Sequence, residues 1–328
     1  MNICFLDNFE LPYNSYDLNS NKIRGAENII INLSRELSIL GHKVTVFNNV
    51  DDDKIIENVK WSNINKLNQK DLDYDVAFTN NDIGLFKKIN SKKKIAFSHS
   101  LQTIEKFIRK KQLLPYLKYK PKIVLLSNYH KNNRNIFLKM FGSIRLDWSV
   151  DHLFINTKIN NDNKDNIAIF TSRPDRNLNL LIDIWKKYIF TKKNKYKLLI
   201  TPNNENLEEF NIFHRKFDNK QNMINDLLSS KIFLVPGHKS ELFCIAAEEA
   251  RELCIPIVTL GIGALSERVE HGITGFVAKN DKEFSNYTID LFNDQSLWNE
   301  IRNNLIKKRG RNSWNKTAIN LIKLIKSF

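Results

Sequence analysis

Residues 231–258 contain two short apolar runs with a helical segment between them. The first run, 232–235, reads Ile-Phe-Leu-Val and ends at Pro236 and Gly237, and the second, 255–258, reads Ile-Pro-Ile-Val. Such runs, bounded by Pro and Gly, are typical of strands that are buried on both faces of a parallel sheet. The residues from about 243 to 253 have a helical pattern that stops before Pro256. The segment therefore predicts a strand–helix–strand unit, which requires an α/β fold with a parallel sheet.

Two carboxylates flank the predicted turn from strand to helix. Glu241 falls in the loop after the strand, and Glu249 falls about two turns into the helix. Open parallel sheets bind ligands at this edge. Backbone N–H groups at the start of a helix favour a phosphate, whereas carboxylates suit the neutral hydroxyl groups of a ribose or a hexose. This combination predicts a nucleotide-sugar site, and the alternative is an ordinary strand–helix–strand unit with surface glutamates.

The residues around these glutamates resemble the donor site of family 4 glycosyltransferases. The resemblance rests on E-L-F-C-I-A-A-E-E-A-R-E-L-C-I-P-I-V from Glu241 and on the later G-I-G-A-L-S-E-R-V-E-H-G-I-T-G-F-V. It implies a retaining enzyme with the GT-B fold, in which two Rossmann-like, doubly wound parallel-sheet domains face a cleft. It also implies that Glu249 binds the ribose hydroxyls and that Glu241 contacts the donor sugar. Further donor contacts are implied for Phe243, Cys244, Ile245, Gly263 and Glu267.

Arg173 and Arg176 follow a predicted strand at 167–170, in the sequence F-T-S-R-P-D-R-N-L. Guanidinium groups bind a diphosphate bidentately and keep their charge at physiological pH. The resemblance implies that both neutralise the leaving nucleoside diphosphate, with Arg176 at the place where the family has a lysine. The alternative is a solvated turn at the start of a helix.

Two candidates lie in the first half of the chain. Arg24-Gly25-Ala26-Glu27 resembles the family's Gly-Gly-x-Glu loop, which implies that Gly25 approaches the donor phosphate. Arg24 replaces the first glycine, so the role of that glycine does not transfer. His99 follows a predicted strand, and the resemblance implies that it lies beside the donor sugar. The alternative for His99 is a structural histidine.

Residues 86–145 carry most of the net charge of +15, because they contain 16 Lys or Arg and a single acid, Glu105. Between residues 102 and 120 the cations alternate with apolar and aromatic side chains. This pattern suits a helix on an anionic membrane surface, and it also suits a polyanion. A solvated face is the alternative. We expect a nucleotide sugar and a glycan or lipid-linked acceptor as partners, with an anionic membrane surface at 86–145 and no nucleic acid.

The pattern of strands and helices occurs twice, which predicts two domains. Residues 1–155 form the predicted acceptor-binding domain, and residues 156–312 form the predicted nucleotide-sugar domain after the polar run 156–166. The amphipathic segment 313–328 is expected to cross back to the first domain, as the family pattern implies.

Several features argue against other classes of protein. Cys4, Cys244 and Cys254 have no Cys-x-x-Cys spacing, which predicts buried thiols rather than a zinc site or disulfides. The cluster Asp51–Asp53 has no matching ligands nearby, which favours solvated loop acids over a metal site. The resemblance implies that cations and helix ends, rather than a metal, stabilise the diphosphate, and we expect no cofactor. The first residues are too acidic for a signal peptide, and no apolar run reaches the roughly 18 residues of a membrane span. We therefore expect a cytoplasmic protein, peripheral at the inner face of the membrane.

The resulting hypothesis is a metal-independent, retaining hexosyltransferase. It would move a hexose from a nucleotide-diphosphate sugar to a glycan or glycolipid acceptor, as in cell-surface polysaccharide biosynthesis. One alternative is a GT-B-fold binding protein that has lost turnover and uses its basic face on membrane or nucleic acid. The departures at Arg24 and Cys244 keep this alternative open. A second alternative is an epimerase or phosphorylase on the same fold.

Overall fold

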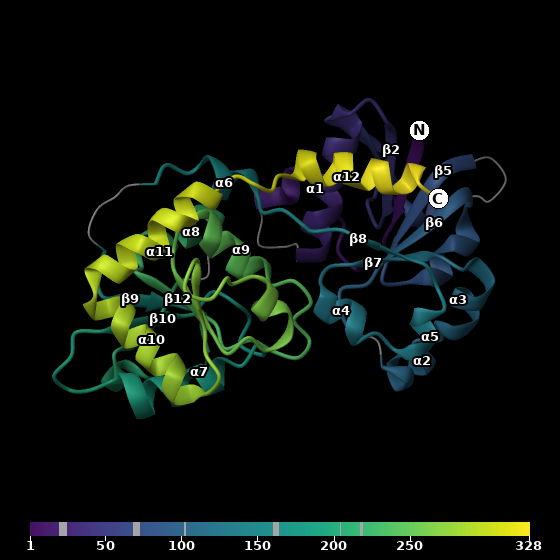
Figure 1. The fold of residues 1–328 in the computed structure, drawn as a ribbon. Helices are drawn as coiled ribbons and strands as arrows, with labels where there is room; N and C mark the ends of the chain where they lie inside the picture. The colour runs from purple at the N-terminus through teal and green to yellow at the C-terminus, as the bar shows by residue number, and fades with distance from the viewer. Residues whose placement is uncertain (20–24, 68–72, 102, 160–163, 204, 217–218) are drawn as a thin grey trace. The chain divides into compact units, whose positions relative to one another are not determined.

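The computed structural model describes residues 1–328 except 20–24, 68–72, 102, 160–163, 204 and 217–218. The described residues pack as two units (Figure 1). Unit 1 comprises Met1–Trp148 together with Ser313–Phe328, and unit 2 comprises Ser149–Asn312. Each unit is an α/β structure built on its own sheet, which confirms the prediction of two Rossmann-like parallel-sheet domains.

Unit 1 contains an eight-stranded sheet with the order β3-β4-β2-β1-β5-β6-β7-β8. All neighbouring strands are parallel except β3 and β4, which form an antiparallel pair at one edge. A stack of Phe5, Phe78 and Phe97 links three central strands through ring centroids 4.7 and 5.3 Å apart. The strands are β1 (Asn2–Leu6), β2 (Lys43–Asn48), β3 (Lys54–Ile56), β4 (Val59–Asn63), β5 (Asp73–Asn80), β6 (Asn90–Phe97), β7 (Lys122–Leu125) and β8 (Ser143–Arg145).

The helices of unit 1 are mostly short. Among its described residues, only α1 (Gly25–Ile39) and α12 (Trp314–Lys326) exceed ten residues. The α-helices between them are α2 (Ile104–Arg109), α3 (Leu113–Tyr119), α4 (Asn128–Asn132) and α5 (Ile136–Lys139), and the 3₁₀ turns are η1 (Ser15–Asn19), η2 (Ile64–Lys66) and η3 (Ile83–Lys88).

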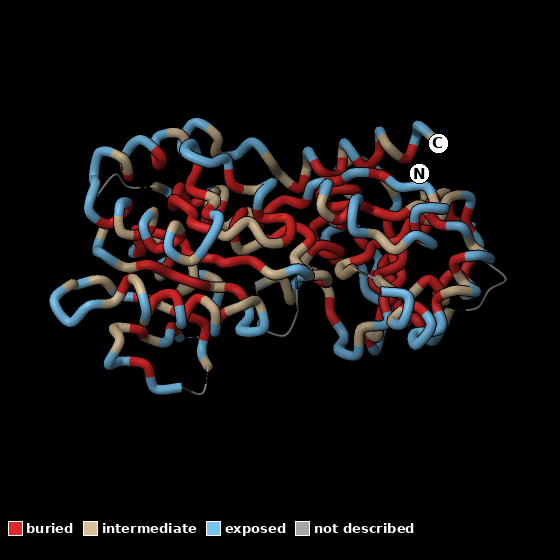
Figure 2. Tube along the Cα trace, turned by 60° about the horizontal axis from the view of Figure 1, so that its bottom comes forward, coloured by how far each residue is buried: buried red, intermediate tan, exposed pale blue. Residues whose placement is uncertain are grey.

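The last helix, α12, packs along α1, so the two ends of the chain meet in unit 1 (Figure 1). Asn315 donates a hydrogen bond of 3.1 Å to the Glu36 carboxylate on α1, and the Trp314 ring lies 6.1 Å from the Trp148 ring. One side of α12 is buried and the other is exposed, as Figure 2 shows. The amphipathic pattern of this segment therefore has its apolar side against unit 1.

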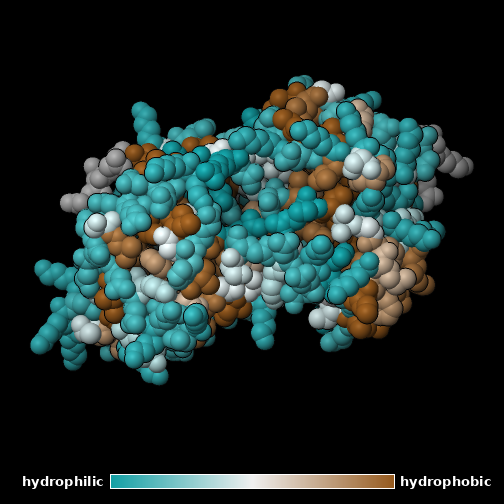
Figure 3. Space-filling model, viewed as in Figure 1, coloured by the Kyte–Doolittle hydropathy of each residue, from teal (hydrophilic) through white to brown (hydrophobic). Residues whose placement is uncertain are grey.

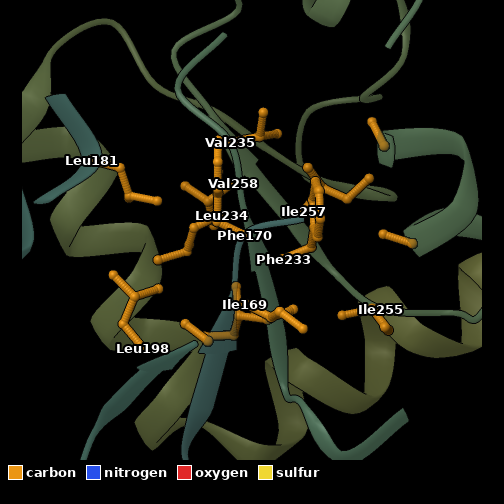
Figure 4. Close-up of a cluster of buried hydrophobic side chains, with 14 of the residues drawn as sticks. Ile169, Phe170, Leu181, Leu198, Phe233, Leu234, Val235, Ile255, Ile257 and Val258 are labelled. Atoms are coloured by element: carbon orange, nitrogen blue, oxygen red, sulfur yellow. The ribbon is translucent and has the colours of Figure 1, made fainter. Parts of the chain in front are cut away.

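Unit 2 contains a six-stranded, wholly parallel sheet with the order β11-β10-β9-β12-β13-β14. Its strands are β9 (Ile167–Ile169), β10 (Lys197–Ile200), β11 (Ile212–His214), β12 (Ile232–Leu234), β13 (Ile257–Thr259) and β14 (Gly275–Val277). Every residue of β12 and β13 is buried, as expected for strands covered on both faces. Figure 4 shows the core that these strands share with β9, β10 and α7.

Helices cover both faces of this sheet because right-handed crossovers run in opposite directions from β9. The α7 and α10 helices pack together, and α8 and α9 pack against β9 and β13. The bounds are α6 (His152–Asn156), α7 (Leu178–Ile184), α8 (Lys220–Ser229), α9 (Ile245–Glu252), α10 (Asp281–Asn293), α11 (Gln295–Lys308), the π-turn η4 (Trp185–Ile189) and the 3₁₀ turns η5 (Glu208–Phe210) and η6 (Gly263–Glu267).

Hydrogen bonds from Arg309 connect the last residues of unit 2 to its first residues. Its guanidinium donates hydrogen bonds to the carbonyl oxygens of Phe154 at 3.1 Å and Ile155 at 2.8 Å, and also to that of Thr157. Its Nε donates to the carbonyl of Glu252 at 2.7 Å. The sequence places the domain boundary at residue 155, before a polar run. In the structure, residues 149–155 pack with unit 2, and Phe154 belongs to its core.

Candidate functional site

The strand order of unit 2 reverses at β9 and β12. From β9 the chain continues to β10 and β11 on one side, and β12, β13 and β14 lie on the other side. Ligands of open α/β sheets bind beyond the carboxyl ends of the strands at such a reversal. The loops that leave β9 and β12 there are 170–177 and 235–244. They carry both arginines and the first glutamate that the sequence singles out.

Two glycines hold the loop after β12 against the loop after β13. Gly237 has φ +99° and Gly263 has φ +77°, and Gly237 pairs with Ile262 in an isolated bridge. A Cβ on Gly263 would lie 2.4 Å from the carbonyl oxygen of His238 and 2.8 Å from that of Glu241. Ala264 donates a backbone hydrogen bond of 2.9 Å to the Glu241 carbonyl. Gly263 thus allows the close contact that fixes the backbone at Glu241.

Replacing Gly263 with alanine should destabilise the protein by about 2 kcal/mol or more. The positive φ strains the backbone of an alanine, and the new Cβ would overlap the two carbonyl oxygens. Gly272 is a matched control, since it has φ +74° and a Cβ added there would have no atom within 4 Å. Gly272→Ala carries only the backbone strain and should cost about 1 kcal/mol. Urea denaturation of both variants measures the difference. Equal losses of stability would contradict the packing role of Gly263.

Glu241, Arg176 and His238 form a polar cluster at the reversal. The Arg176 Nη1 lies 3.2 Å from His238 Nδ1, and Arg176 Nε lies 3.9 Å from Glu241 Oε2. The side chains of Arg176 and Glu241 are only 20% and 19% exposed. Burial raises the pKa of Glu241, while the charge of Arg176 acts in the opposite direction. The cluster therefore places a cation and a carboxylate side by side in a partly desolvated position.

Glu241 also caps the start of α9. Its Oε1 accepts a hydrogen bond of 3.1 Å from the backbone N–H of Cys244, which has φ +64°. The Phe243 and Cys244 side chains are buried, and the Arg268 guanidinium lies 4.5 Å from the Phe243 ring centroid. Burial raises the pKa of the Cys244 thiol well above its usual value. Phe243 and Cys244 can therefore meet a ligand mainly through their backbone, whereas Ile245 is half-buried at the first turn of α9.

The consecutive glutamates of α9 have different surroundings. Glu248 is buried and pairs with Arg251 at 2.5 Å and Arg268 at 3.5 Å. Glu249 is partly exposed and interacts electrostatically with Lys220 and Asp151. Burial raises the pKa of Glu249 to about 8, which Lys220 opposes and Asp151 reinforces. The carboxylate of Glu248 is thus occupied by internal ion pairs. Glu249, one turn into α9, forms no such pair with a described arginine, so its carboxylate is available for a ligand.

Sequence reasoning assigns no role to the residues that surround Glu249. Lys220 Nζ and Asp151 Oδ2 form an ion pair of 2.7 Å, in which the side chains are 16% and 9% exposed. Arg215 is buried and pairs with Asp226 at 3.1 Å. Lys220 and Arg215 come from the region of α8 and from the end of β11, so only the tertiary fold brings them near Glu249. His238 is a weaker candidate in the sequence, and the structure makes it part of the Arg176 cluster.

The remaining candidates of unit 2 lie at its surface. Arg173 is exposed and pairs with Asp175 at 2.7 Å, in a loop that also contains Arg176. Glu267 is exposed at the end of η6, in the loop after β13. The structure thus brings Arg176, Glu241 and Gly263 together, while Arg173 and Glu267 occupy exposed positions in the loops after β9 and β13.

Gly25 and His99 belong to unit 1. Gly25 is exposed at the first position of α1, and Arg24 lies outside the described residues. His99 follows β6, and its backbone N–H donates a hydrogen bond of 3.2 Å to Asn81 Oδ1. Burial lowers the pKa of His99 to about 4, so its imidazole is neutral at physiological pH. Its Nε2 is buried without a hydrogen-bond partner among the described residues.

The three cysteines are free and buried, which confirms the prediction of buried thiols. Asp53 forms an ion pair of 3.3 Å with Lys60. Within the described part of the chain, no three or more His, Cys, Asp or Glu side chains are arranged as metal ligands.

Comparison with known proteins relates the chain to sugar-transferring enzymes. The model of the family described as glycosyl transferases group 1 matches residues 151–311, nearly all of unit 2. No curated protein sequence matches the chain. Several solved structures resemble it over its whole length at low identity, which shows a shared fold.

Sucrose-phosphate synthase from Thermosynechococcus elongatus has 12% identity and a TM-score of 0.68, covering 100% of this chain and 99% of that one. A glycosyltransferase from Rickettsia africae ESF-5 has 16% identity and a TM-score of 0.68, with 99% and 98% covered. Anabaena HepE in complex with UDP-glucose has 14% identity and a TM-score of 0.69, with 100% of both chains covered. The match across unit 2 and the fold of both units lead to one conclusion: residues 151–311 belong to the family of glycosyl transferases group 1, and the chain as a whole has the GT-B fold.

Proposed function

We propose that this glycosyltransferase moves a hexose from a nucleoside-diphosphate sugar to a glycan or lipid-linked acceptor, with retention of the anomeric configuration. The observation that carries the proposal is the arrangement of Arg176, Glu241 and Glu249 at the strand reversal of unit 2. A guanidinium, a helix start and two carboxylates there match the diphosphate and the hydroxyl groups of a nucleotide sugar.

In this proposal each charged group binds a different part of the donor. Glu249 accepts hydrogen bonds from the ribose hydroxyls, and Glu241 accepts them from the sugar. Arg176 and the N–H groups at the start of α9 stabilise the negative charge that grows on the diphosphate as the anomeric bond breaks. Arg173 also binds the diphosphate, for which it breaks its ion pair with Asp175. Breaking this ion pair costs little free energy because both side chains are exposed.

The donor proposed first is UDP-glucose, because HepE was solved with that compound and has the same fold over its full length. Unit 1 supplies the acceptor site, whereas His99 and Gly25 keep the roles beside the donor that the family resemblance implies. The low pKa of His99 leaves its imidazole neutral, so one ring nitrogen can accept a hydrogen bond from a sugar hydroxyl.

Titration calorimetry with a panel of nucleoside diphosphates and nucleotide sugars tests the donor. Incubation with the preferred donor and simple glycoside acceptors, followed by NMR of the product, then tests transfer and anomeric configuration. Tight donor binding without transfer or hydrolysis for any acceptor would favour a binding protein that has lost turnover. A product with inverted configuration would refute retention.

We also propose that transfer needs no divalent metal, because Arg173 and Arg176 supply positive charge where the diphosphate would lie. Activity should then change less than about twofold when EDTA replaces Mg²⁺ or Mn²⁺, since guanidinium groups carry out the neutralisation. Initial rates with and without chelator measure this. Loss of activity with EDTA and its recovery on adding a metal would contradict the proposal.

A further inference from the structure

Apolar side chains are exposed on three short helices of unit 1. In the described residues, 13 large hydrophobic side chains are exposed, and seven of them fall between residues 104 and 140. Exposed apolar residues normally occur singly, so such a concentration indicates an interaction site. The seven are Ile104, Ile108, Leu114, Leu117, Ile136, Phe137 and Met140, with exposed fractions from 42% to 76%.

A buried aromatic cluster joins the three helices into one surface. Tyr116 of α3 packs against Phe107 of α2, with ring centroids 4.9 Å apart, and against Phe141, just after α5, at 5.3 Å. Figure 3 shows apolar atoms gathered at the lower right, where Figure 1 labels α2, α3 and α5. We name this surface, from residue 104 to residue 140, the apolar face.

Cations surround the apolar face without acidic partners. Glu105 is the single acid among residues 86–145. Seven exposed Lys and Arg side chains on or beside the three helices form no ion pair with any described residue. They are Arg109, Lys110, Lys111, Lys118, Lys120, Lys131 and Lys139. Their charge is therefore available to an anionic partner.

A groove beside α3 is lined by both apolar side chains and cations. It has a volume of about 610 Å³ and opens to solvent. Leu114, Pro115, Leu117 and Tyr119 line it, and Lys87 and Lys118 contribute to the same wall. An amphiphile with an acyl chain and a negatively charged head group matches such a lining.

The combination of charge and exposed apolar side chains selects one kind of partner. A second copy of this face would bring like charges together, which opposes self-association. Nucleic acid would use the cations but would leave the aliphatic side chains in water. A bilayer with anionic lipids satisfies both, because the apolar side chains enter the interface while the cations meet the head groups. No described helix is long and apolar enough to span a membrane, so the contact would be peripheral.

We propose that the apolar face, formed by α2, α3 and α5, docks unit 1 on the surface of an anionic lipid bilayer. This inference is independent of the proposed sugar transfer. The full-length protein should float with vesicles containing about 30% phosphatidylglycerol at low salt, and much less with pure phosphatidylcholine. Raising the salt to about 0.5 M should weaken binding because it screens the cations.

Two variants separate the apolar and charged contributions. The triple variant Leu114→Ser, Ile136→Ser, Met140→Ser should bind vesicles at least about tenfold more weakly, since these side chains would enter the interface. Its matched control is Tyr16→Ser, Ile39→Ser, Ile55→Ser, which removes equally exposed apolar groups elsewhere in unit 1.

The charge variant is Lys110→Gln, Lys118→Gln, Lys139→Gln, for which about 100-fold weaker binding is expected. Its control, Lys192→Gln, Lys193→Gln, Lys195→Gln, removes three exposed cations from unit 2.

Both controls should bind like the wild type, and circular dichroism checks that each variant is folded. Failure of the wild-type protein to float, or equal binding to neutral vesicles, would refute the proposal. Equal losses of vesicle binding in a variant of the apolar face and in its control would also refute the proposal. If the serine variant changed only the oligomeric state in solution, the face would be a protein interface and the proposal would be wrong.

Discussion

Replacing Arg176 with alanine is expected to lower kcat/KM for sugar transfer by about 100- to 1000-fold, the effect of removing one preorganised group that stabilises developing charge. Arg176 is only 20% exposed and lies 3.9 Å from Glu241 and 3.2 Å from His238. Its removal would take the charge from the proposed diphosphate site. It would also leave the Glu241 carboxylate, whose pKa burial already raises, without its nearest cation. Steady-state kinetics with the preferred nucleotide sugar measure the loss.

Two further variants make this result specific. Arg176→Lys keeps the charge but not the planar fork, so it should recover part of the lost activity. Arg35→Ala removes an arginine from a surface ion pair with Glu57 in unit 1 and should leave kcat/KM unchanged. If Arg176→Ala were as active as Arg35→Ala, Arg176 would have no part in the reaction.

The Glu249→Gln variant is expected to bind the donor about 100-fold more weakly at about pH 8.5. A carboxylate that accepts two hydrogen bonds contributes about 3 kcal/mol more than a neutral amide of the same shape. Because burial raises the pKa of Glu249 to about 8, the wild-type carboxyl is largely protonated at lower pH. The two proteins should therefore differ less in donor affinity at about pH 6.5. Titration calorimetry at both pH values tests this dependence.

The same substitution is expected to stabilise the folded protein. The unfolded chain releases the proton of Glu249 above about pH 4.5, whereas the folded chain keeps it until about pH 8. Stability from this group is therefore lost as the pH rises through that range, and a glutamine at this position has no proton to lose. The advantage of the variant should be absent below about pH 4.5 and reach a few kcal/mol near pH 8, since each unit of pKa shift corresponds to about 1.4 kcal/mol.

Thermal unfolding of both proteins as a function of pH measures the stabilisation. Glu300→Gln, which removes an exposed glutamate of α11, is the control and should change neither donor affinity nor stability. An unchanged donor affinity in Glu249→Gln would remove Glu249 from the site. A loss of stability near pH 8 would show that its carboxylate is well solvated or well paired.

The sequence predicted the elements that are apolar throughout or strongly periodic. The buried strands of unit 2 were recognisable because their patterns do not depend on distant residues. The edge strands β3 (Lys54–Ile56) and β8 (Ser143–Arg145) were missed, since a strand of three residues with two of them exposed has no clear alternation of apolar and polar residues. The sequence pattern of residues 178–189 predicts a single helix, whereas in the structure α7 ends at Ile184 and its last turn widens into a π-turn from Trp185.

The residues of the candidate site were predictable where they lie close together in the sequence. Glu241 and Glu249 belong to a single strand–turn–helix segment, so their spacing was visible in the sequence. The ion pair of Lys220 with Asp151 was not, because its partners are 69 residues apart and meet only through the packing of unit 2. The difference between Glu248 and Glu249 was also hidden, since it depends on Arg268, which reaches Glu248 from the end of η6 and only through the tertiary fold.

The hydrogen bonds of Arg309 have a consequence for how this chain can be cut and rejoined. They hold the carbonyls of residues 154–157 beside the end of α11, so the beginning and the end of unit 2 lie at one place. A loop whose ends already meet loses little entropy when it is closed. We therefore expect unit 2 to tolerate excision as an autonomous fragment, or new termini elsewhere on its surface, whereas unit 1 depends on α12 arriving from the far end of the polypeptide.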